Sequence, residues 1–341
     1  MFRIQVGKKQ KQDMTLRSVL LVGGTGFIGS SVAQRLSALG LHVIVPTRRL
    51  TKGDALRMLP TIDLVEADIY DTCALCGLMN EVDAVVNLVG VLHSESDAPY
   101  GPEFARAHVE LPRTLVAAAR LSEVPRIVHV SALGADIHGP SEYLRSKADG
   151  EAVIRATGPE IAWSIFRPAV VFGPHDKFLN LFATLTAHLP VLPLGGAHTR
   201  FQPVFVEDVA AAIVHAVLHR AGLGETIELA GPRIYTLAEL VSYVAQLQDH
   251  HCMILPLSEK LALLQAAIME CLPGPLMSRD NVRSMRRDCV ASTSVAGTTA
   301  SMPFGIHATA LETVAPQWLC DDGDWRGMFN GFRQRAHRRN L

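Results

Sequence analysis

Val19-Leu-Leu-Val-Gly-Gly-Thr-Gly-Phe-Ile-Gly29 is the stretch that decides the fold of this chain. Its short run of valine and leucine is typical of a buried parallel strand. Beyond Gly29, the residues Val32, Ala33 and Leu36 recur at helical spacing, so the glycines form a strand-to-helix turn. In this setting, Gly24-x-Gly26-x-x-Gly29 predicts a dinucleotide-binding site with the pyrophosphate at the helix N-terminus.

Each glycine of this turn has a physical reason to be glycine. Gly23 and Gly24 permit a tight turn, and Gly26 has no Cβ that would hold a pyrophosphate away from the backbone. Gly29 allows the helix to pack closely on the strand. The free N–H groups and the positive dipole end of the helix would then face the phosphates.

The residues after the second strand indicate which dinucleotide binds. A site that prefers NAD places an acidic residue about 20 positions after the glycines, where it binds the ribose hydroxyls. This chain has Thr47, Arg48 and Arg49 there, and no Asp or Glu before Asp54. The fork of an arginine suits a 2′-phosphate. We therefore predict NADP(H) in preference to NAD(H); the alternative is that both arginines are merely solvated at a strand end.

Composition excludes several functional classes. The chain has 341 residues, 48% of them hydrophobic, which is enough to bury a substantial core. A net charge of −1 does not favour nucleic acid as a partner. No run of about 18 apolar residues is present, so we expect membrane contact to be peripheral at most. Without the apolar core of a secretory signal in residues 1–17, we predict a cytoplasmic protein, with a peripheral position on the inner membrane as the alternative.

Strands and helices alternate over the first 230 residues. Strand-like runs occur at 19–22, 41–45, 62–65, 84–90, 127–131, 161–166 and 226–229, and helical spacing occurs at 104–121, 142–156 and 209–218. Such alternation is typical of a parallel sheet covered by helices on both faces. We therefore predict an α/β fold with a Rossmann-type doubly wound parallel sheet.

The texture of the sequence changes after Pro168, where prolines and glycines become frequent. Thr236-x-x-Glu239 is a capping box that opens a helix to about residue 248, and another helix is expected over 258–271. We predict an NAD(P)-binding domain over 18–172, to which 203–231 return. A smaller interleaved C-terminal domain would comprise 173–202 and 232–325, with a disordered extension at 1–17 and a basic tail at 326–341.

Tyr143-x-x-x-Lys147 places two reactive side chains one helical turn apart, close to the end of the fifth strand. In dehydrogenase chemistry such a tyrosine exchanges the proton, while the lysine lowers its pKa and holds the nicotinamide ribose. Ser131 would polarise a substrate carbonyl. The alternative is that Lys147 holds the ribose, Tyr143 merely packs, and no turnover occurs. The fourteen histidines show no ligand spacing, so we predict no metal site.

These motifs together resemble the short-chain dehydrogenase/reductase superfamily in its extended or atypical branch. Within it, the chain looks most like the nucleotide-binding accessory subunit of respiratory complex I and its bacterial relatives. That resemblance is carried by Tyr143-Leu-Arg-Ser-Lys147, by 171–180 with its Asp176 to Asn180 signature, by 202–208 and by 305–312. It implies a bound NADP(H) that mainly holds the subunit together, and a position peripheral to the membrane.

The resemblance also implies roles for individual residues. The pyrophosphate would be held by Gly23, Thr25, Gly26, Phe27, Ile28 and Gly29. Arg48, with Arg49, would bind the 2′-phosphate, and Asp68 with Ile69 the adenine. The ribose would lie against Leu88, Val89 and Gly90, and the nicotinamide end against Lys147, Pro168 and Val171.

One departure bears on the reaction. Sugar epimerases of the extended branch usually carry Ser or Thr two positions after the first serine that follows strand five, where this chain has Leu133. That difference weakens a sugar-nucleotide substrate. Two hypotheses remain: an NADP(H)-binding subunit that docks on respiratory complex I, or an active NADP-dependent reductase or epimerase that acts on a small or lipid-like carbonyl substrate through Tyr143 and Lys147.

Overall fold

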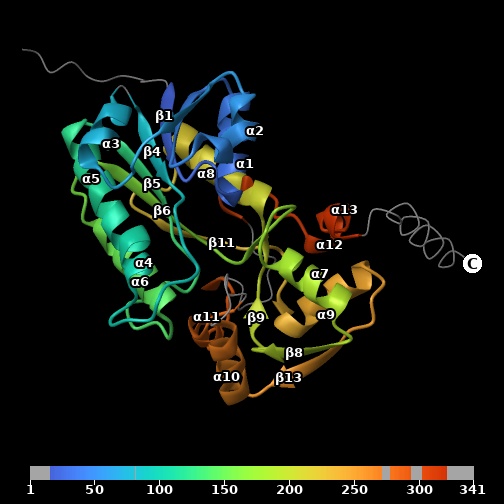
Figure 1. Cartoon of the computed structure of the whole chain (residues 1–341). Helices are drawn as coiled ribbons and strands as arrows, with labels where there is room; N and C mark the ends of the chain where they lie inside the picture. Colours follow the sequence, from blue (N-terminus) through green and yellow to red (C-terminus); the bar gives the residue numbers. More distant parts are fainter. Residues whose placement is uncertain (1–15, 81, 271–276, 293–301, 321–341) are drawn as a thin grey trace, which may run out of the picture.

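A seven-stranded parallel sheet forms the centre of the larger body of the molecule (Figure 1). The computed structural model describes residues 16–80, 82–270, 277–292 and 302–320. The strand order is β11-β6-β5-β4-β1-β2-β3. The strands are β1 (Ser18–Val22), β2 (His42–Thr47), β3 (Ile62–Glu66), β4 (Ala84–Asn87), β5 (Arg126–Val130), β6 (Ala162–Pro168) and β11 (Thr226–Leu229). The predicted Rossmann-type sheet is confirmed.

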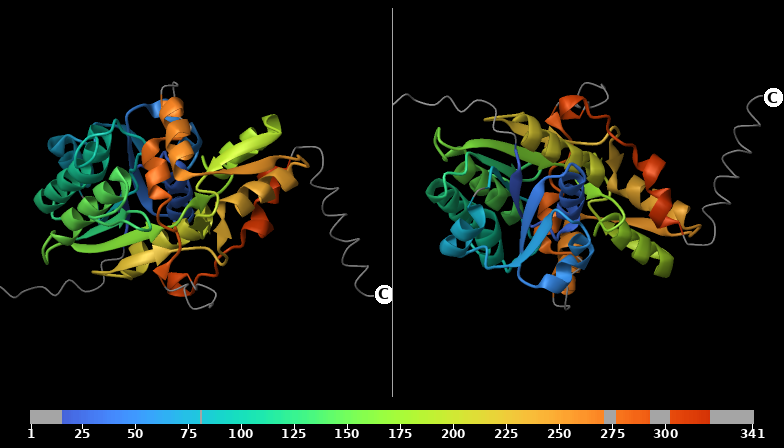
Figure 2. Two further views of the ribbon diagram at one scale, coloured as in Figure 1. Left: turned by 90° about the horizontal axis from the view of Figure 1, so that it is seen from below. Right: turned by 90° about the horizontal axis from the view of Figure 1, so that it is seen from above.

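The pleat of β1 shows why the sheet needs cover on both faces. Val19 and Leu21 belong to the hydrophobic cluster on one face, and Leu20 and Val22 to the cluster on the other. Successive side chains of a strand point to opposite faces, so an unbroken apolar strand must be buried on both. Helices lie on the two sides of the sheet when the molecule is seen from below or above (Figure 2).

Six helices supply that cover. One face packs against α1 (Phe27–Ala38), α2 (Asp54–Arg57) and α8 (Val206–His219), and the other against α3 (Thr72–Met79), α5 (Leu111–Leu121) and α6 (Glu142–Arg155). Val32, Ala33 and Leu36, which indicate the first helix by their spacing, are fully buried. The strand order reverses between β1 and its neighbour β4, and open α/β sheets bind ligands in the crevice at such a switch point.

The helix expected over 104–121 is continuous in position but not in winding. It consists of α4 (Pro102–Ala105), a π-helical segment at Arg106–Glu110, and α5. A π-turn holds one more residue than an α-turn, which shifts the side chains before it relative to those after it, and such segments occur frequently at functional sites. The periodic pattern alone predicts a plain α-helix here.

A smaller body packs beside the large sheet around its own hydrophobic cluster. Two parallel strands, β8 (Val191–Gly195) and β13 (Met253–Leu257), pair there. The helices are α7 (Leu179–His188), α9 (Leu237–Leu247), α10 (Glu259–Glu270), α11 (Arg279–Ser284), α12 (Leu311–Val314) and α13 (Pro316–Leu319). The pairs β7 (Val171–Phe172) with β10 (Val204–Phe205), and β9 (Arg200–Phe201) with β12 (Tyr235–Thr236), complete the strands.

The capping box predicted at the start of α9 is confirmed: Thr236 and Glu239 bond each other's backbone N–H groups. The predicted domain boundaries stay predictions. Most of the extension at 1–17 and all of the tail at 326–341 lie outside the described residues. Among the helices of the described part, none is both long enough and apolar enough to cross a membrane.

Two carboxylates in the family-like segments after residue 170 fix the backbone, Asp176 within its own segment and Asp208 against a distant one. The buried Asp176 carboxylate accepts N–H bonds from Phe178 at 2.7 Å and Leu179 at 2.6 Å, at the start of α7, and from Gly173 at 3.1 Å. On α8, the Asp208 carboxylate accepts from both the N–H and the hydroxyl of Thr309. Asp176 therefore fixes the start of α7, and Asp208 fixes the segment that leads to α12.

We predict that Asp176→Ala lowers the free energy of unfolding by about 2 kcal/mol, because buried N–H groups lose their acceptor. Asp176→Asn keeps one amide oxygen for the start of α7 and should lose about half as much. Urea unfolding of both variants against the unsubstituted chain measures this. Equal stability of the Ala and Asn variants would contradict the capping role.

Candidate dinucleotide-binding site

The glycine turn after β1 has the shape that a pyrophosphate requires. Gly23 has φ +88°, in the left-handed region that favours glycine. A Cβ on Gly29 would overlap the carbonyl oxygen of Gly23, so the helix can approach the strand this closely only without a side chain there. A Cβ on Gly24 would lie 2.8 Å from a methyl group of Val45 on β2. All three positions therefore require glycine.

Helix α1 begins in this turn with its first N–H groups free for a ligand. Its N-cap is Gly26, no side chain caps it, and no acidic residue occupies its first turn. Thr25 and Gly26 lie on the accessible side of the turn, whereas Ile28 packs into the core and the ring of Phe27 lies against Gly173. An anion is stabilised at such a helix end by N–H donors and by the helix dipole. The predicted cradle thus fits a diphosphate.

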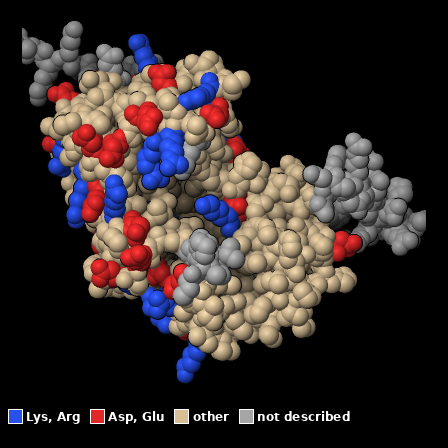
Figure 3. Space-filling view, in the orientation of Figure 1, with Lys and Arg blue, Asp and Glu red and all other residues tan. Residues whose placement is uncertain are grey.

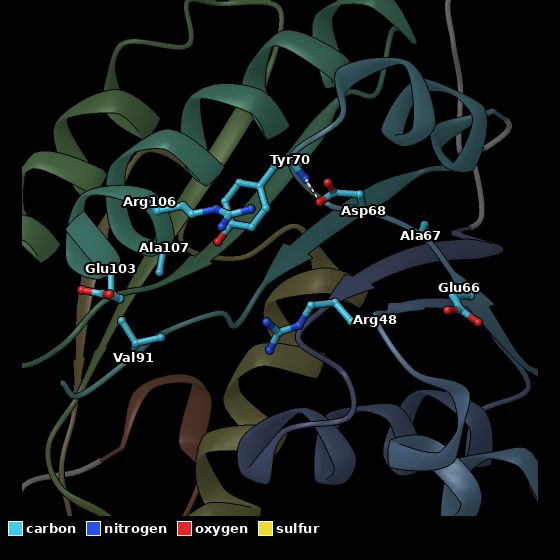
Figure 4. Close-up of a pocket in the computed structure, with 9 residues that line it drawn as sticks. All are labelled: Arg48, Glu66, Ala67, Asp68, Tyr70, Val91, Glu103, Arg106 and Ala107. Carbon is cyan, nitrogen blue, oxygen red and sulfur yellow. Dashed lines mark hydrogen bonds between the residues drawn. The ribbon is translucent and has the colours of Figure 1, made fainter. Parts of the chain in front are cut away.

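A cavity of about 560 Å³ lies beside the carboxyl ends of β2 and β3 (Figure 4). Arg48, at the end of β2, and Asp68, just after β3, both line it, as expected for the adenosine end of the nucleotide. Arg49 does not line this cavity, and its carbonyl accepts the Thr47 hydroxyl. Ile69 packs against the hydrophobic core beneath. The residues that line the cavity are Arg48, Glu66, Ala67, Asp68, Tyr70, Val91, Glu103, Arg106 and Ala107.

The far wall of this cavity holds two residues that sequence reasoning missed. The guanidinium carbon of Arg106 lies 4.2 Å from the centre of the Tyr70 ring. Tyr70 follows β3, and Arg106 opens the π-helical segment. Nothing in the local sequence pattern marks either residue, because only the crossing of the chain between β3 and the helix after β4 brings them together.

The loop after β4 links the glycine turn to the lysine of Tyr-x-x-x-Lys. A Cβ on Gly23 would lie 3.2 Å from the backbone of Leu88 and Val89, so the two segments are in close contact. On the other side, the Nζ of Lys147 lies 3.1 Å from the place that a Cβ on Gly90 would occupy. The fold thus brings the predicted pyrophosphate segment, the predicted ribose segment and Lys147 next to one another.

Lys147 is buried on α6, and its ammonium donates to the carbonyl of Val130 at 3.3 Å. Burial lowers the pKa of Lys147 to about 8, although the Glu151 carboxylate acts in the opposite direction. Burial raises the pKa of the Tyr143 hydroxyl above its ordinary value, and Cys289 adds to that rise. The two side chains share α6, and in this structure the Lys147 ammonium is bonded to a backbone carbonyl.

Ser131 follows β5 and is buried, and its hydroxyl has no hydrogen-bond partner within the described part of the chain. A buried hydroxyl without a partner is costly unless a ligand supplies one. At the ends of the next strands, Pro168 closes β6 and accepts the N–H of Leu133 at 2.9 Å, and Val171 opens β7. Ser131, Pro168 and Val171 thus lie at the carboxyl edge of the sheet, where the nicotinamide end is expected.

His108, in the π-helical segment, is a positioning residue that the sequence does not reveal. Its Nε2 accepts the N–H of Val91 at 3.1 Å, so its Nδ1 carries the proton and donates to the Ser146 hydroxyl at 2.8 Å. That hydroxyl in turn donates to the carbonyl of Tyr143. Burial, aided by Lys147 and His129, lowers the pKa of His108 to about 2. A neutral imidazole thus links the loop after β4 to α6.

The start of α6 is held by the smaller body. Both oxygens of the buried Asp280 carboxylate on α11 accept N–H bonds, from Glu142 at 2.7 Å and from Tyr143 at 3.0 Å. Ser141 caps the next amide of the same helix. The helix that carries Tyr143 and Lys147 is therefore oriented from two directions. Within the described residues, no group of three or more His, Cys, Asp or Glu is placed to hold a metal ion.

Comparison with known sequences agrees with this geometry. The model of the NAD dependent epimerase/dehydratase family matches residues 19–230, which include the glycine turn, Tyr143 and Lys147. The chain belongs to this family. Family members bind NAD or NADP, so a nicotinamide dinucleotide is the ligand that the cradle would hold.

Three relatives are similar to this chain over different lengths. Mitochondrial NADH dehydrogenase (ubiquinone) 1 alpha subcomplex subunit 9 of Arabidopsis thaliana is 31% identical over 79% of this chain and 70% of its own length. The Mus musculus protein of the same name is 33% identical over 70% of this chain and 63% of its own. A ceramide reductase of Caulobacter vibrioides is 31% identical over 58% of this chain and 59% of its own length.

Solved structures of other proteins share the fold of this chain. An Escherichia coli NADPH-dependent quinone oxidoreductase complexed with NADPH superimposes with a TM-score of 0.69 at 18% identity, over 88% of this chain and 99% of that chain. A nucleoside-diphosphate-sugar epimerase from Staphylococcus aureus gives 0.62 at 17% identity, over 79% and 88%. These identities are too low to transfer a reaction.

The buried histidines predict a loss of stability in mild acid. Burial lowers the pKa of His129 to about 3, as it lowers that of His108, so both stay neutral in the fold and take up a proton when it unfolds below pH 6.5. As the pH falls below that value, each should remove up to about 1.4 kcal/mol of unfolding free energy per pH unit.

Urea unfolding between pH 6.5 and 5, above the range in which most carboxyl groups titrate, measures this slope. His129→Asn should reduce the slope by the share of one histidine. His198→Gln, at an exposed position, is the matched control and should leave it unchanged. A slope that is the same in all three proteins would disprove the assignment.

Proposed function

We propose that this chain is an NADP(H)-binding accessory or assembly subunit of respiratory NADH:quinone oxidoreductase, in which the nucleotide is held mainly for structural reasons. The observation that carries the proposal is the similarity to alpha subcomplex subunit 9, at 31% identity over 79% of the chain. The similarity extends past the family match, which ends at residue 230, and so includes part of the smaller body.

The arrangement around Tyr143 supports a structural rather than a catalytic nucleotide. A tyrosine that exchanges a proton at neutral pH needs its pKa lowered, and a nearby lysine is the usual means. Here burial raises the pKa of Tyr143, and the Lys147 ammonium donates to a backbone carbonyl instead. When bound, the nucleotide would supply a hydride carrier. The chain's own residues would hold its ribose through Lys147 and its phosphates through the start of α1.

The surface of the smaller body supports a docking role. On the face seen in Figure 3, charged side chains gather over the larger body, whereas the smaller body presents few. Leu264 and Ile268 on α10 are 59% and 63% exposed, and Met253 on β13 is 63% exposed. Leu264 and Ile268 lie one helical turn apart on α10, and neighbouring exposed apolar side chains mark interaction surfaces in soluble proteins. The exposed face of α10 would meet the partner subunit, and the protein would lie peripherally on the inner membrane.

A specific observation favours a second candidate function. The unpartnered hydroxyl of Ser131 and the retained pair Tyr143 and Lys147 are the parts that an NADP-dependent reductase needs. The relative from Caulobacter vibrioides is named a ceramide reductase. An active reductase on a small or lipid-like carbonyl substrate is therefore the alternative, in which Tyr143 would donate the proton and Ser131 would polarise the carbonyl.

Tyr143→Phe separates the two functions. In an accessory subunit, the variant should retain its co-purifying NADP(H) and should assemble with the respiratory subunits as the unsubstituted chain does. In a reductase, NADPH oxidation with a carbonyl substrate should fall about 10²- to 10⁴-fold, since positioned acid–base groups contribute that much. Tyr243→Phe, the same change in the smaller body, is the control. A large selective loss of turnover in Tyr143→Phe would reject the structural role.

Docking is tested by replacing the apolar face of α10. Leu264→Ser with Ile268→Ser should abolish co-purification with respiratory subunits, while the nucleotide stays bound, because these side chains contribute little to the core. Met58→Ser alters a side chain that is 84% exposed on the larger body and is the control. Retention of the partner by the double variant would show that α10 is not the docking face.

A further inference from the structure

We infer that Arg106 is a second cation for the phosphate at the adenosine end of the nucleotide, and that it sets the preference for NADP(H) together with Arg48. The inference rests on the proposed function, because it assumes that the crevice binds a dinucleotide. It adds a residue that neither the glycine motif nor the Tyr-x-x-x-Lys pair includes.

The first observation is that two positive charges face one cavity. Arg48 extends from the end of β2, and Arg106 extends from the helix after β4, into the same space (Figure 4). Over the described residues, neither guanidinium lies within ion-pair distance of a carboxylate, whereas most other arginines on this structure bond carboxylates or carbonyls. Two unpaired guanidiniums converging on a cavity are suited to an anion with several acceptor oxygens.

The second observation is that Arg106 is held in place before any ligand arrives. Its guanidinium lies 4.2 Å from the centre of the Tyr70 ring, within the range of a cation–π interaction. The backbone of Tyr70 is fixed by its own N–H, which donates to the Asp68 carboxylate at 3.0 Å. Burial raises the pKa of the Tyr70 hydroxyl, and the charges of Arg106 and Arg48 lower it, so both cations lie near the same ring.

The carboxylates that line this cavity bond other groups or face solvent, and none of them forms an ion pair with Arg48 or Arg106 among the described residues. Glu103 already accepts the hydroxyl of Ser94 at 2.6 Å and the N–H of Glu95 at 3.2 Å. Asp68 accepts the N–H of Tyr70, and Glu66 is exposed at the end of β3. Within the described part of the chain, neither Arg48 nor Arg106 is therefore ion-paired with a carboxylate that lines the cavity.

The position of Arg106 indicates which phosphate it would bind. The start of α1 provides the N–H groups for the pyrophosphate, and Lys147 lies at the nicotinamide end beside Gly90. Arg106 lies at neither place, since it shares its cavity with Arg48 and Asp68 at the ends of β2 and β3. In this fold the 2′ position of the adenosine ribose lies at the end of the second strand. Arg106 and Arg48 would therefore bind the 2′-phosphate from two sides.

The test compares NADPH with NADH, which lacks that phosphate, by isothermal titration calorimetry on the full chain. In Arg106→Ala, the affinity for NADPH should fall about tenfold to a hundredfold, as expected for a lost charge-assisted hydrogen bond, while the affinity for NADH stays within about twofold. The affinity for NADPH should also depend less on salt than in the unsubstituted chain. Arg113→Ala, at an exposed position on α5, should change nothing.

Other results overturn the inference. Unchanged NADPH affinity in Arg106→Ala would show that Arg106 only covers the ring of Tyr70. Equal losses for NADPH and NADH would assign it to the pyrophosphate or to general packing. Arg106→Lys keeps the charge and should retain part of the preference, which guards against a folding defect in the alanine variant; loss equal to that of alanine would contradict the charge role. If the unsubstituted chain binds neither nucleotide, the proposed function itself fails.

Discussion

The close approach of α1 to the turn after β1 is the constraint on which the rest of the structure depends. Gly29 lies against the carbonyl of Gly23, with no room for a single added carbon. Only this contact lets the first amides of α1 reach a phosphate while the helix still buries Val32 and Leu36 against the sheet. Packing of the helix and binding of a phosphate therefore both require that residue 29 has no side chain, so a larger residue there would disturb both.

Local patterns predict the parts of this fold whose causes are local. The apolar run of β1, the glycines that follow it and the spacing of α1 are all consequences of neighbouring residues, and so is the capping box of α9. The pairing of Tyr143 with Lys147 on one helix follows from their spacing in the same way. That spacing does not predict their electrostatics, because the burial that lowers the pKa of Lys147 and the Val130 carbonyl that accepts from its ammonium both come from the tertiary fold.

The residues that sequence reasoning missed all owe their roles to tertiary contacts. Tyr70 and Arg106 meet only because the chain passes through β4 between them. His108 lies in a π-turn, which apolar periodicity does not reveal because the flanking residues still repeat at helical spacing. Asp280 reaches the start of α6 from 137 residues further along the chain. A single sequence carries no local signal for such partners.

The contact of Asp280 with the first amides of α6 makes the two bodies of the molecule interdependent. If α11 is displaced, two N–H groups at the start of α6 lose their acceptor, and the cost is borne by the helix that carries Lys147. With Lys147 holding the nucleotide as proposed, a partner that stabilises α11 would also strengthen nucleotide binding, and by thermodynamic linkage the nucleotide would strengthen the binding of that partner by the same factor. Loss of the attachment at α11 would then weaken nucleotide binding, and loss of the nucleotide would weaken the attachment, without any change in the residues that contact either.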